Sequence, residues 1–144
     1  NRRINSAIPG LLILLVRTML YHYTFRTYKG MPLLEDAELR GFLKSAFHEI
    51  SLDKGFKMVE CEILCDHVHV LIEQDYTLSS SLVMKNLKGV SSRRLFQKYP
   101  TNRYDIRKLW GRSFHARKIG AEEKDKVVCY IKGQRNRDGI DRRF

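Results

Sequence analysis

The stretch from residue 61 to residue 74 constrains the fold more than any other part of the chain. It reads as the end of one strand, a tight turn near Asp66 and a second strand. Side chains two positions apart share one face of a strand, so His67 and His69 point the same way. The apolar residues that alternate with them point to the other face, which we expect to be the core: Val68, Val70 and Ile72. The segment therefore predicts a β-hairpin with a histidine pair on one face.

The rest of the chain predicts an order of strand, helix, strand, strand, helix, strand, helix. The first six elements match the βαββαβ pattern of a ferredoxin-like sandwich, an α+β fold in which an antiparallel sheet carries two helices on one face. RRM-type nucleic-acid binders use the same arrangement. The expected ranges, in chain order, are 19–28, 35–52, 56–64, the strand from residue 67, 80–98, 109–119 and 122–135.

Two of the expected helices show an apolar stripe at a spacing of three and four residues, which predicts the face that each buries. In the first helix the stripe is Leu39, Phe42, Leu43, Ala46, Phe47 and Ile50. In the second it is Leu82, Val83, Leu87, Val90 and Leu95. The remaining surface of the second helix is basic and is either a DNA-binding patch or a solvated helix face; its residues are Lys85, Lys88, Arg93 and Arg94.

The charge balance narrows the class of partner. The 144 residues include 27 Lys and Arg against 16 Asp and Glu, a formal net charge of +11. Such an excess favours a polyanionic partner, with nucleic acid first and an anionic membrane surface second, although a basic protein without specific chemistry fits equally well. Three irregularly spaced cysteines indicate neither a disulfide framework nor a four-cysteine zinc site. We therefore expect reduced thiols in a cytoplasmic protein.

The chain divides into an N-terminal extension, residues 1–18, and one domain, residues 19–144. The apolar run at residues 8–16 is shorter than the roughly 20 residues that span a bilayer. Arginines precede it as in a signal peptide, but no clear cleavage site follows. We expect this extension to pack on the domain or on a partner chain, with no membrane span.

Two groups of residues could carry chemistry. His67 and His69, one pleat apart, can bind one metal ion or one phosphate; alternatively they are ordinary half-buried strand residues. Tyr130 and Gln134 lie four residues apart and share one face of the last helix. A tyrosine hydroxyl, with an ordinary pKa of about 10, becomes a useful nucleophile when a metal polarises its target. Taken alone, however, Tyr130 is better explained as a residue that packs the helix on the sheet, because aromatic residues of helices mostly serve packing.

Four segments in this order closely resemble the single-tyrosine HUH transposases of prokaryotic insertion sequences, the TnpA-like enzymes, with the REP-associated tyrosine transposases as more distant relatives. The segments are Asp66–Ile72, Leu87–Arg93, Leu109–Phe114 and the Tyr130-x-x-x-Gln134 ending. The resemblance covers about residues 21–134. Each motif alone is weak, and their order and spacing carry the assignment.

The resemblance implies that Tyr130 is the catalytic nucleophile and that His67, His69 and Gln134 bind Mg²⁺ or Mn²⁺. It implies cleavage and rejoining of single-stranded DNA at hairpin-bearing element ends through a 5′-phosphotyrosine intermediate, without a nucleotide cofactor. It also implies a homodimer, in which Tyr130 serves either its own subunit or its neighbour. Glu62 is a further carboxylate near the metal only if the strand register places it on the histidine face.

Two other functions remain open at this point. One is a non-catalytic RRM-like or domesticated protein that only binds single-stranded nucleic acid, which would have no use for His67, His69 and Tyr130 together. The other is a metal-dependent phosphoesterase that uses the histidine pair with water and leaves Tyr130 and Gln134 unexplained. Formation of a covalent protein–DNA adduct separates the transposase from both.

Overall fold

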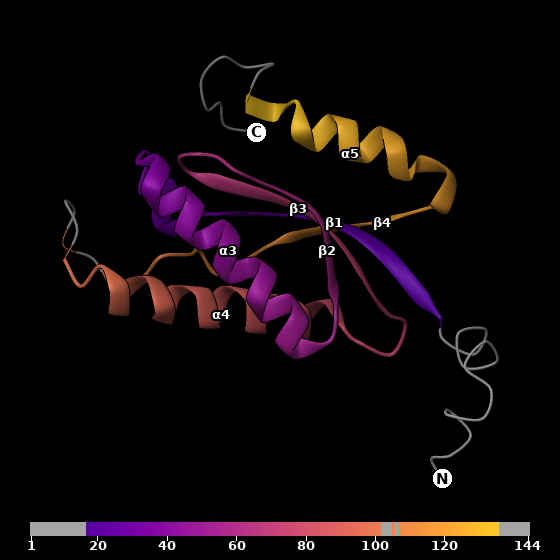
Figure 1. Cartoon of the computed structure of the whole chain (residues 1–144), viewed down its shortest axis with the longest axis horizontal. Coiled ribbons are helices and arrows are strands. Elements are labelled where there is room, and N and C mark those ends of the chain that lie inside the picture. Colours follow the sequence, from indigo (N-terminus) through magenta and orange to yellow (C-terminus); the bar gives the residue numbers. More distant parts are fainter. Residues whose placement is uncertain (1–16, 102–104, 106, 136–144) are drawn as a thin grey trace, which may run out of the picture.

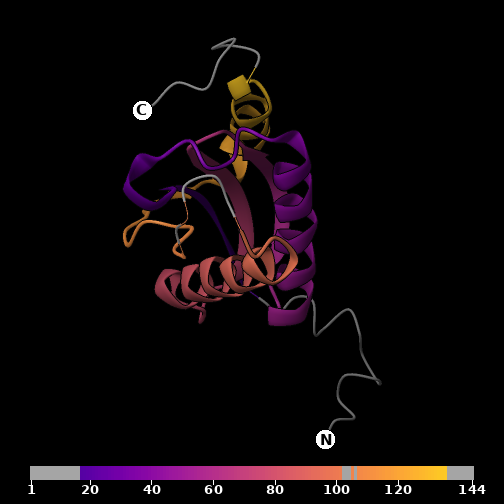
Figure 2. The same cartoon turned by 90° about the vertical axis from the view of Figure 1, so that its left-hand side faces the viewer.

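The computed structural model describes residues 17–101, 105 and 107–135. Its centre is a four-stranded antiparallel sheet in the order β2-β3-β1-β4. The strands are β1 (Thr18–Arg26), β2 (Lys57–Ile63), β3 (His67–Asp75) and β4 (His115–Ile119), and the helices are α3 (Ala37–Lys54), α4 (Ser80–Lys98) and α5 (Lys124–Lys132). The helices α3 and α4 cover one face of the sheet and α5 lies over the other (Figures 1 and 2). The predicted α+β, ferredoxin-like fold with an additional C-terminal helix is confirmed.

The extension predicted for residues 1–18 lies outside the described residues except for Arg17 and Thr18. Across the described ranges, no helix combines the length and apolar character needed to cross a membrane.

Side-chain caps set where α3 and α4 begin. The Asp36 carboxylate accepts a hydrogen bond of 2.8 Å from the backbone N–H of Glu38, so α3 begins two residues after the expected position. Gly55 adopts a left-handed conformation, with φ of 82°, and ends that helix. The Ser79 hydroxyl accepts from the backbone N–H of Leu82 at 3.1 Å, and α4 spans the predicted range.

The main core lies between the sheet and the helix pair α3 and α4. It contains the predicted strand residues Val68, Val70 and Ile72, all fully buried. The α3 stripe faces this core as expected. On α4 one residue of the predicted stripe is wrong, because Leu82 is 45% exposed. Leu82 lies in the first turn of the helix. Met84, which precedes Leu87 by one helical turn and so shares its face, is buried instead.

A second, smaller core holds α5 against the opposite face of the sheet. It consists of four buried residues, Leu71, Ile119, Val127 and Ile131. The last helix begins later than predicted, because residues Ala121–Glu123 form a 3₁₀ turn before α5. The histidine face of the sheet is therefore also the face that α5 covers.

The fourth strand is shorter than the predicted range 109–119 and begins only at His115. Before it, Trp110 forms an isolated bridge with Thr27, and Gly111 donates its N–H to the Arg26 carbonyl at 2.9 Å. The Trp110 ring turns into the main core, with its centroid 4.9 Å from that of Phe25. Because this segment serves to insert an aromatic ring beneath α4, it does not continue the ladder with β1.

Candidate active site

The histidine pair lies in β3, which is hydrogen-bonded to β2 on one side and to β1 on the other. His67 is 2% exposed and His69 is 3% exposed, and their ring centroids are 5.2 Å apart. In the register, Glu62 of β2 and Thr24 of β1 both lie opposite His69. Two bonded neighbours hold the backbone of both histidines in place, so the spacing of the two imidazoles is fixed by the sheet.

Each imidazole is oriented by a hydrogen bond to its Nδ1 atom. Oδ1 of Asp66 lies 2.7 Å from Nδ1 of His67, and both side chains are almost fully buried. Because a carboxylate accepts, Nδ1 of His67 donates, which places the lone pair of the neutral ring on Nε2. Nε2 of His22 lies 3.1 Å from Nδ1 of His69. Both contacts are made at Nδ1, so in each ring Nε2 is the nitrogen that neither contact uses.

The imidazole of His22 is suited to this neighbour because it stays neutral. Burial lowers the pKa of His22 to about 4, with smaller contributions in the same direction from the charge of Arg117 and from His115. A neutral His22 keeps one ring nitrogen as an acceptor near neutral pH. No charge repulsion is then added beside His69.

Tyr130 projects from α5 toward these rings. Its ring centroid lies 5.9 Å from that of His69 and 6.0 Å from that of His22, edge-on in both cases. Tyr130 is 43% exposed. A cavity of about 540 Å³ opens beside it, and two cationic side chains, Arg117 and Lys126, are in its lining. A phosphate-bearing ligand therefore has room next to the hydroxyl.

The end of α5 is held on the edge of β2. Nε of Arg135 lies 3.3 Å from the Glu62 carboxylate, and the same guanidinium donates to the Ile63 carbonyl. Gln134 is only 6% exposed, and its Nε2 donates to the Tyr130 carbonyl at 3.1 Å. The last turn of the helix thus lies at the level of the Glu62–His69 pair, with the Gln134 side chain enclosed.

Sequence reasoning gave no role to His22 or Asp66. His22 was inside the expected strand 19–28, but its proximity to His69 depends on the register between β1 and β3, which the sequence does not encode locally. Asp66 was assigned only to the turn. Its position next to His67 was the available signal, because a carboxylate beside a histidine can orient the ring. The register also places Glu62 on the histidine face.

The predicted basic patch on α4 divides into two pairs. Lys85 and Lys88 are in the lining of a cleft between α4 and the segment 107–114, whereas Arg93 and Arg94 are not. Arg94 forms an ion pair of 2.9 Å with Glu49 of α3. The cleft lies on the α4 side of the sheet, away from Tyr130. The structure therefore brings together His67, His69, Tyr130 and the end of α5, but not the four basic residues.

The donor set suits a divalent ion only if an amide takes part. Within the described ranges, no group of three or more His, Cys, Asp or Glu side chains is arranged to hold a metal. Two imidazoles plus the amide oxygen of Gln134 form a mixed nitrogen and oxygen set, which is acceptable to Mn²⁺ and less natural for Mg²⁺. The predicted ligand set therefore fits a metal that takes its other ligands from phosphate and water.

The family model for IS200-like transposases matches residues 15–134, a range that includes the histidine pair, Tyr130 and Gln134. The chain belongs to the IS200-like transposase family. Its relatives include the ISDra2 transposase TnpA of Deinococcus radiodurans, 26% identical over 103 residues, which cover 70% of this chain and 74% of the relative. The IS200 transposase of Salmonella typhimurium is 30% identical over 103 residues, covering 70% and 67%.

Solved structures agree with this family assignment. A crystal structure of a putative transposase from Deinococcus radiodurans aligns with a TM-score of 0.65 and 26% identity, covering 83% of this chain and 92% of that one. The structure of a REP-associated tyrosine transposase bound to a REP hairpin aligns with a TM-score of 0.64 at 15% identity, covering 84% and 68%. The second match supports the fold alone. The prediction of a transposase of the insertion-sequence, TnpA-like group is confirmed.

Proposed function

We propose that this IS200-like transposase cleaves and rejoins single-stranded DNA at the ends of its element through a covalent bond to Tyr130. The observation that carries the proposal is the placement of the Tyr130 ring 5.9 Å from His69, beside a cavity whose lining includes Arg117 and Lys126 as well as Glu123. A packing tyrosine would be enclosed, whereas this one is 43% exposed at the histidine pair. A protein that only bound DNA would not require that arrangement.

The reaction exchanges one phosphodiester bond for another. The Tyr130 oxygen bonds to phosphorus as the bond from phosphorus to the 3′ oxygen breaks, so the DNA strand is left with a 5′-phosphotyrosine link and a 3′-hydroxyl. The phenolic proton is balanced by the proton that the departing 3′ oxygen gains. A 3′-hydroxyl from another DNA end reverses the same step. Because the number of phosphoester bonds is conserved, no nucleotide cofactor is required.

In this proposal His67, His69 and Gln134 hold Mg²⁺ or Mn²⁺, which when bound acts as a Lewis acid on the scissile phosphate. The other residues act by position. Asp66 and His22 orient the imidazoles through Nδ1, and the fixed spacing on β3 means that no reorganisation is needed when substrate arrives. The hydrogen bond from Gln134 to the Tyr130 carbonyl links the amide to the turn that carries the nucleophile.

The DNA substrate is proposed to carry a hairpin near the cleavage site. The net charge of +11 favours a polyanion, and the REP-associated neighbour of similar fold was solved with a hairpin bound. We also propose a homodimer. Tyr130 lies beside His69 of the same chain, which corresponds to a dimer in which each tyrosine acts in its own subunit; action on the partner's sheet is the alternative.

The test is incubation of the protein with labelled single-stranded oligonucleotides that carry hairpins from the flanks of its genomic locus, with Mg²⁺ or Mn²⁺, followed by a denaturing gel. We expect a slow-migrating, protease-sensitive adduct that requires metal and is absent in Tyr130→Phe. Tyr76→Phe is the matched control, because Tyr76 is 55% exposed and outside the site. Binding without an adduct for all such substrates would favour the binding module, and cleavage that persists in Tyr130→Phe would favour the phosphoesterase.

Mixing two inactive variants tests which chain supplies the tyrosine. Tyr130→Phe lacks the nucleophile, and His67→Ala lacks a metal ligand. In a mixed dimer the intact tyrosine and the intact histidine pair lie on different chains, so they can act together only when α5 of one chain reaches the site of the other. Recovery of adduct on mixing indicates action between subunits. Absence of recovery, with mixed dimers demonstrated by co-purification through an affinity tag on one variant, indicates action within one chain.

A further inference from the structure

Arg117 of the edge strand β4 reaches the cavity beside Tyr130. In the register Arg117 lies directly opposite His22 of β1. Residues directly opposite each other on neighbouring strands project from the same face of a sheet, so Arg117 shares the face of His22 and of His69, which His22 contacts. Its side chain is in the lining of the cavity of about 540 Å³, together with His22 and Tyr130. Strand pairing therefore fixes the backbone that carries this guanidinium relative to the histidine pair.

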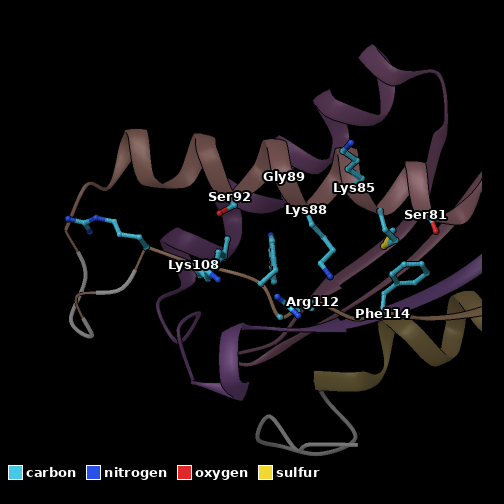
Figure 3. A pocket seen from close by; sticks show the side chains of 13 residues that line it. Ser81, Lys85, Lys88, Gly89, Ser92, Lys108, Arg112 and Phe114 are labelled. Carbon is cyan, nitrogen blue, oxygen red and sulfur yellow. The ribbon is translucent and has the colours of Figure 1, made fainter.

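The cations on the other face of the sheet cannot take this place. Figure 3 shows Lys88 and Arg112 in the cleft beside α4, on the face of the sheet opposite to α5. On the side of Tyr130 the cavity is lined by Arg117 and Lys126. Lys126 belongs to the same helix as Tyr130 and precedes it by one turn, so it is positioned by α5. Arg117 is the cation of this cavity that the sheet positions.

The contact that Arg117 makes with Glu123 is readily exchanged. Nη1 of Arg117 lies 3.7 Å from Oε2 of Glu123, which is longer than a hydrogen bond, and the two side chains are 52% and 42% exposed. An ion pair of this length and exposure contributes little to stability. The other carboxylate oxygen of Glu123 is engaged, because Oε1 accepts the backbone N–H of Gly120 at 3.0 Å. Glu123 is therefore held in place, whereas Arg117 can turn to another anion at little cost.

A phosphate beside Tyr130 is an anion that suits this guanidinium. The phosphate of a DNA linkage carries its charge on two non-bridging oxygens, and these oxygens keep the charge while a nucleophile adds to phosphorus. The two parallel N–H donors of an arginine match such a pair of oxygens, whereas a lysine ammonium acts as a single point of charge. Donors that are in position before the reaction stabilise the transition state without a cost of reorganisation.

We propose that Arg117 is a further catalytic residue, which exchanges Glu123 for the phosphate that Tyr130 attacks and donates two hydrogen bonds to its non-bridging oxygens. The inference rests on the proposed function, in which Tyr130 is the nucleophile. The Tyr130 oxygen bonds to phosphorus as the bond to the 3′ oxygen breaks, and the phenolic proton is balanced by the proton that the 3′ oxygen gains. Arg117 keeps its own protons throughout, so it neutralises charge and transfers none.

Two substitutions distinguish this role from a purely structural ion pair. Arg117→Gln and Glu123→Gln both break the contact, so an ion pair that only fastened α5 to β4 would give the same loss of adduct formation in both. We expect opposite effects instead. Arg117→Gln should lower the maximal rate of adduct formation, at saturating oligonucleotide, by about 10- to 100-fold, the value of one hydrogen-bonded charge. Glu123→Gln should keep or raise this rate, because glutamine can still accept from Gly120 but no longer holds the guanidinium.

Two further variants serve as controls for these rates. Arg117→Lys should recover part of the lost rate, because it restores the charge without the paired donors. Lys44→Gln removes the same net charge from an exposed position of α3 and should leave the rate unchanged. Melting temperatures measured in parallel identify any variant that loses its fold.

The phosphate contact can also be measured without chemistry. The binding assay uses the full chain with Tyr130→Phe in EDTA, with and without Arg117→Gln. Fluorescence anisotropy follows labelled single-stranded oligonucleotides in which one linkage at a time is a neutral methylphosphonate. With Arg117 present, neutralising the contacted linkage should weaken binding about tenfold. With Arg117→Gln that linkage should lose its effect while the others keep theirs, and it should be the linkage that is cleaved in the adduct assay.

The outcomes separate this inference from the proposed function. The inference is overturned, while adduct formation at Tyr130 stands, by equal losses of rate in Arg117→Gln and Glu123→Gln, or by an unchanged rate in Arg117→Gln. A methylphosphonate pattern that is the same with and without Arg117, or a contacted linkage other than the cleaved one, would also overturn it. If the unmodified protein forms no adduct and one linkage still loses its effect in Arg117→Gln, the phosphate site at Arg117 stands and the transfer chemistry fails.

Discussion

The hydrogen bond between Asp66 and His67 makes a sharp prediction about metal binding. The substitution Asp66→Asn keeps the shape of the side chain but removes its charge, and Asp66→Ala removes the acceptor altogether. In both variants the backbone carbonyl of residue 66 can still accept from the N–H and hydroxyl of Thr27, at 3.0 and 3.2 Å in the native protein. The turn before β3 should therefore persist.

The expected size of the effect follows from burial and distance. The bond is 2.7 Å long between side chains that are 2% and 3% exposed, so water does not substitute for the carboxylate. Removing such an outer partner of a metal-binding histidine typically lowers metal affinity 10- to 100-fold, which is about 1.4 to 2.8 kcal/mol. We expect about tenfold for Asp66→Asn and closer to 100-fold for Asp66→Ala, which also leaves a buried donor on His67 unsatisfied.

The assay is Mn²⁺ titration followed by electron paramagnetic resonance, in the Tyr130→Phe background with a single-stranded oligonucleotide bound. Asp53→Asn is the control for the lost charge, since Asp53 is exposed at the end of α3. Melting temperatures measured in parallel identify any loss of fold. Unchanged Mn²⁺ affinity in both Asp66 variants would refute the reasoning that the carboxylate orients His67 for metal.

Three further predictions concern stability and reactivity. Ser91→Ala should lower the free energy of unfolding by about 1–3 kcal/mol in urea denaturation, because it leaves the buried Nε1–H of Trp110 without the hydroxyl that now accepts from it at 3.0 Å; an unchanged midpoint would contradict this. Gly89→Ala should raise the stability by about 1 kcal/mol, since no atom opposes the added methyl group. Burial raises the pKa of Cys61 to about 12, so Cys61 stays a thiol at pH 8.5. A maleimide should therefore label the exposed Cys129 in the native protein and Cys61 only in denaturant. Rapid labelling of Cys61 in the native protein would contradict this prediction.

The parts of the fold that the sequence predicted are those where local pattern and packing agree. The alternation in β3 placed the histidines and the valines on opposite faces, and the apolar stripe of α3 indicated its buried side. The range 109–119 was predicted as one strand because its residues favour extended structure, but the core requires Trp110 beside Phe25 and so only the last part pairs. Local strand propensity cannot indicate that the packing of Trp110 in the core will prevail over strand pairing in the first part of this range.

The candidate residues of the site could be named from the sequence, whereas their geometry could not. His67, His69, Tyr130 and Gln134 followed from spacing and from family resemblance. His22 reaches His69 only because β1 pairs with β3 in one register, a contact between residues 47 positions apart. The division of the basic α4 residues between a cleft and a solvated face likewise depends on where the segment 107–114 crosses the helix.

The two halves of the proposed reaction centre are attached to the fold with unequal strength. His67 and His69 belong to a strand bonded on both sides above the large core, whereas Tyr130 belongs to a helix held mainly by a cluster of four buried side chains. Amide hydrogens of β3 should therefore exchange with solvent only on global unfolding, while those of α5 exchange through a smaller opening. In mild urea the protein should accordingly lose adduct formation, together with the amide of Gln134, before the β3 strand that carries the histidine pair unfolds.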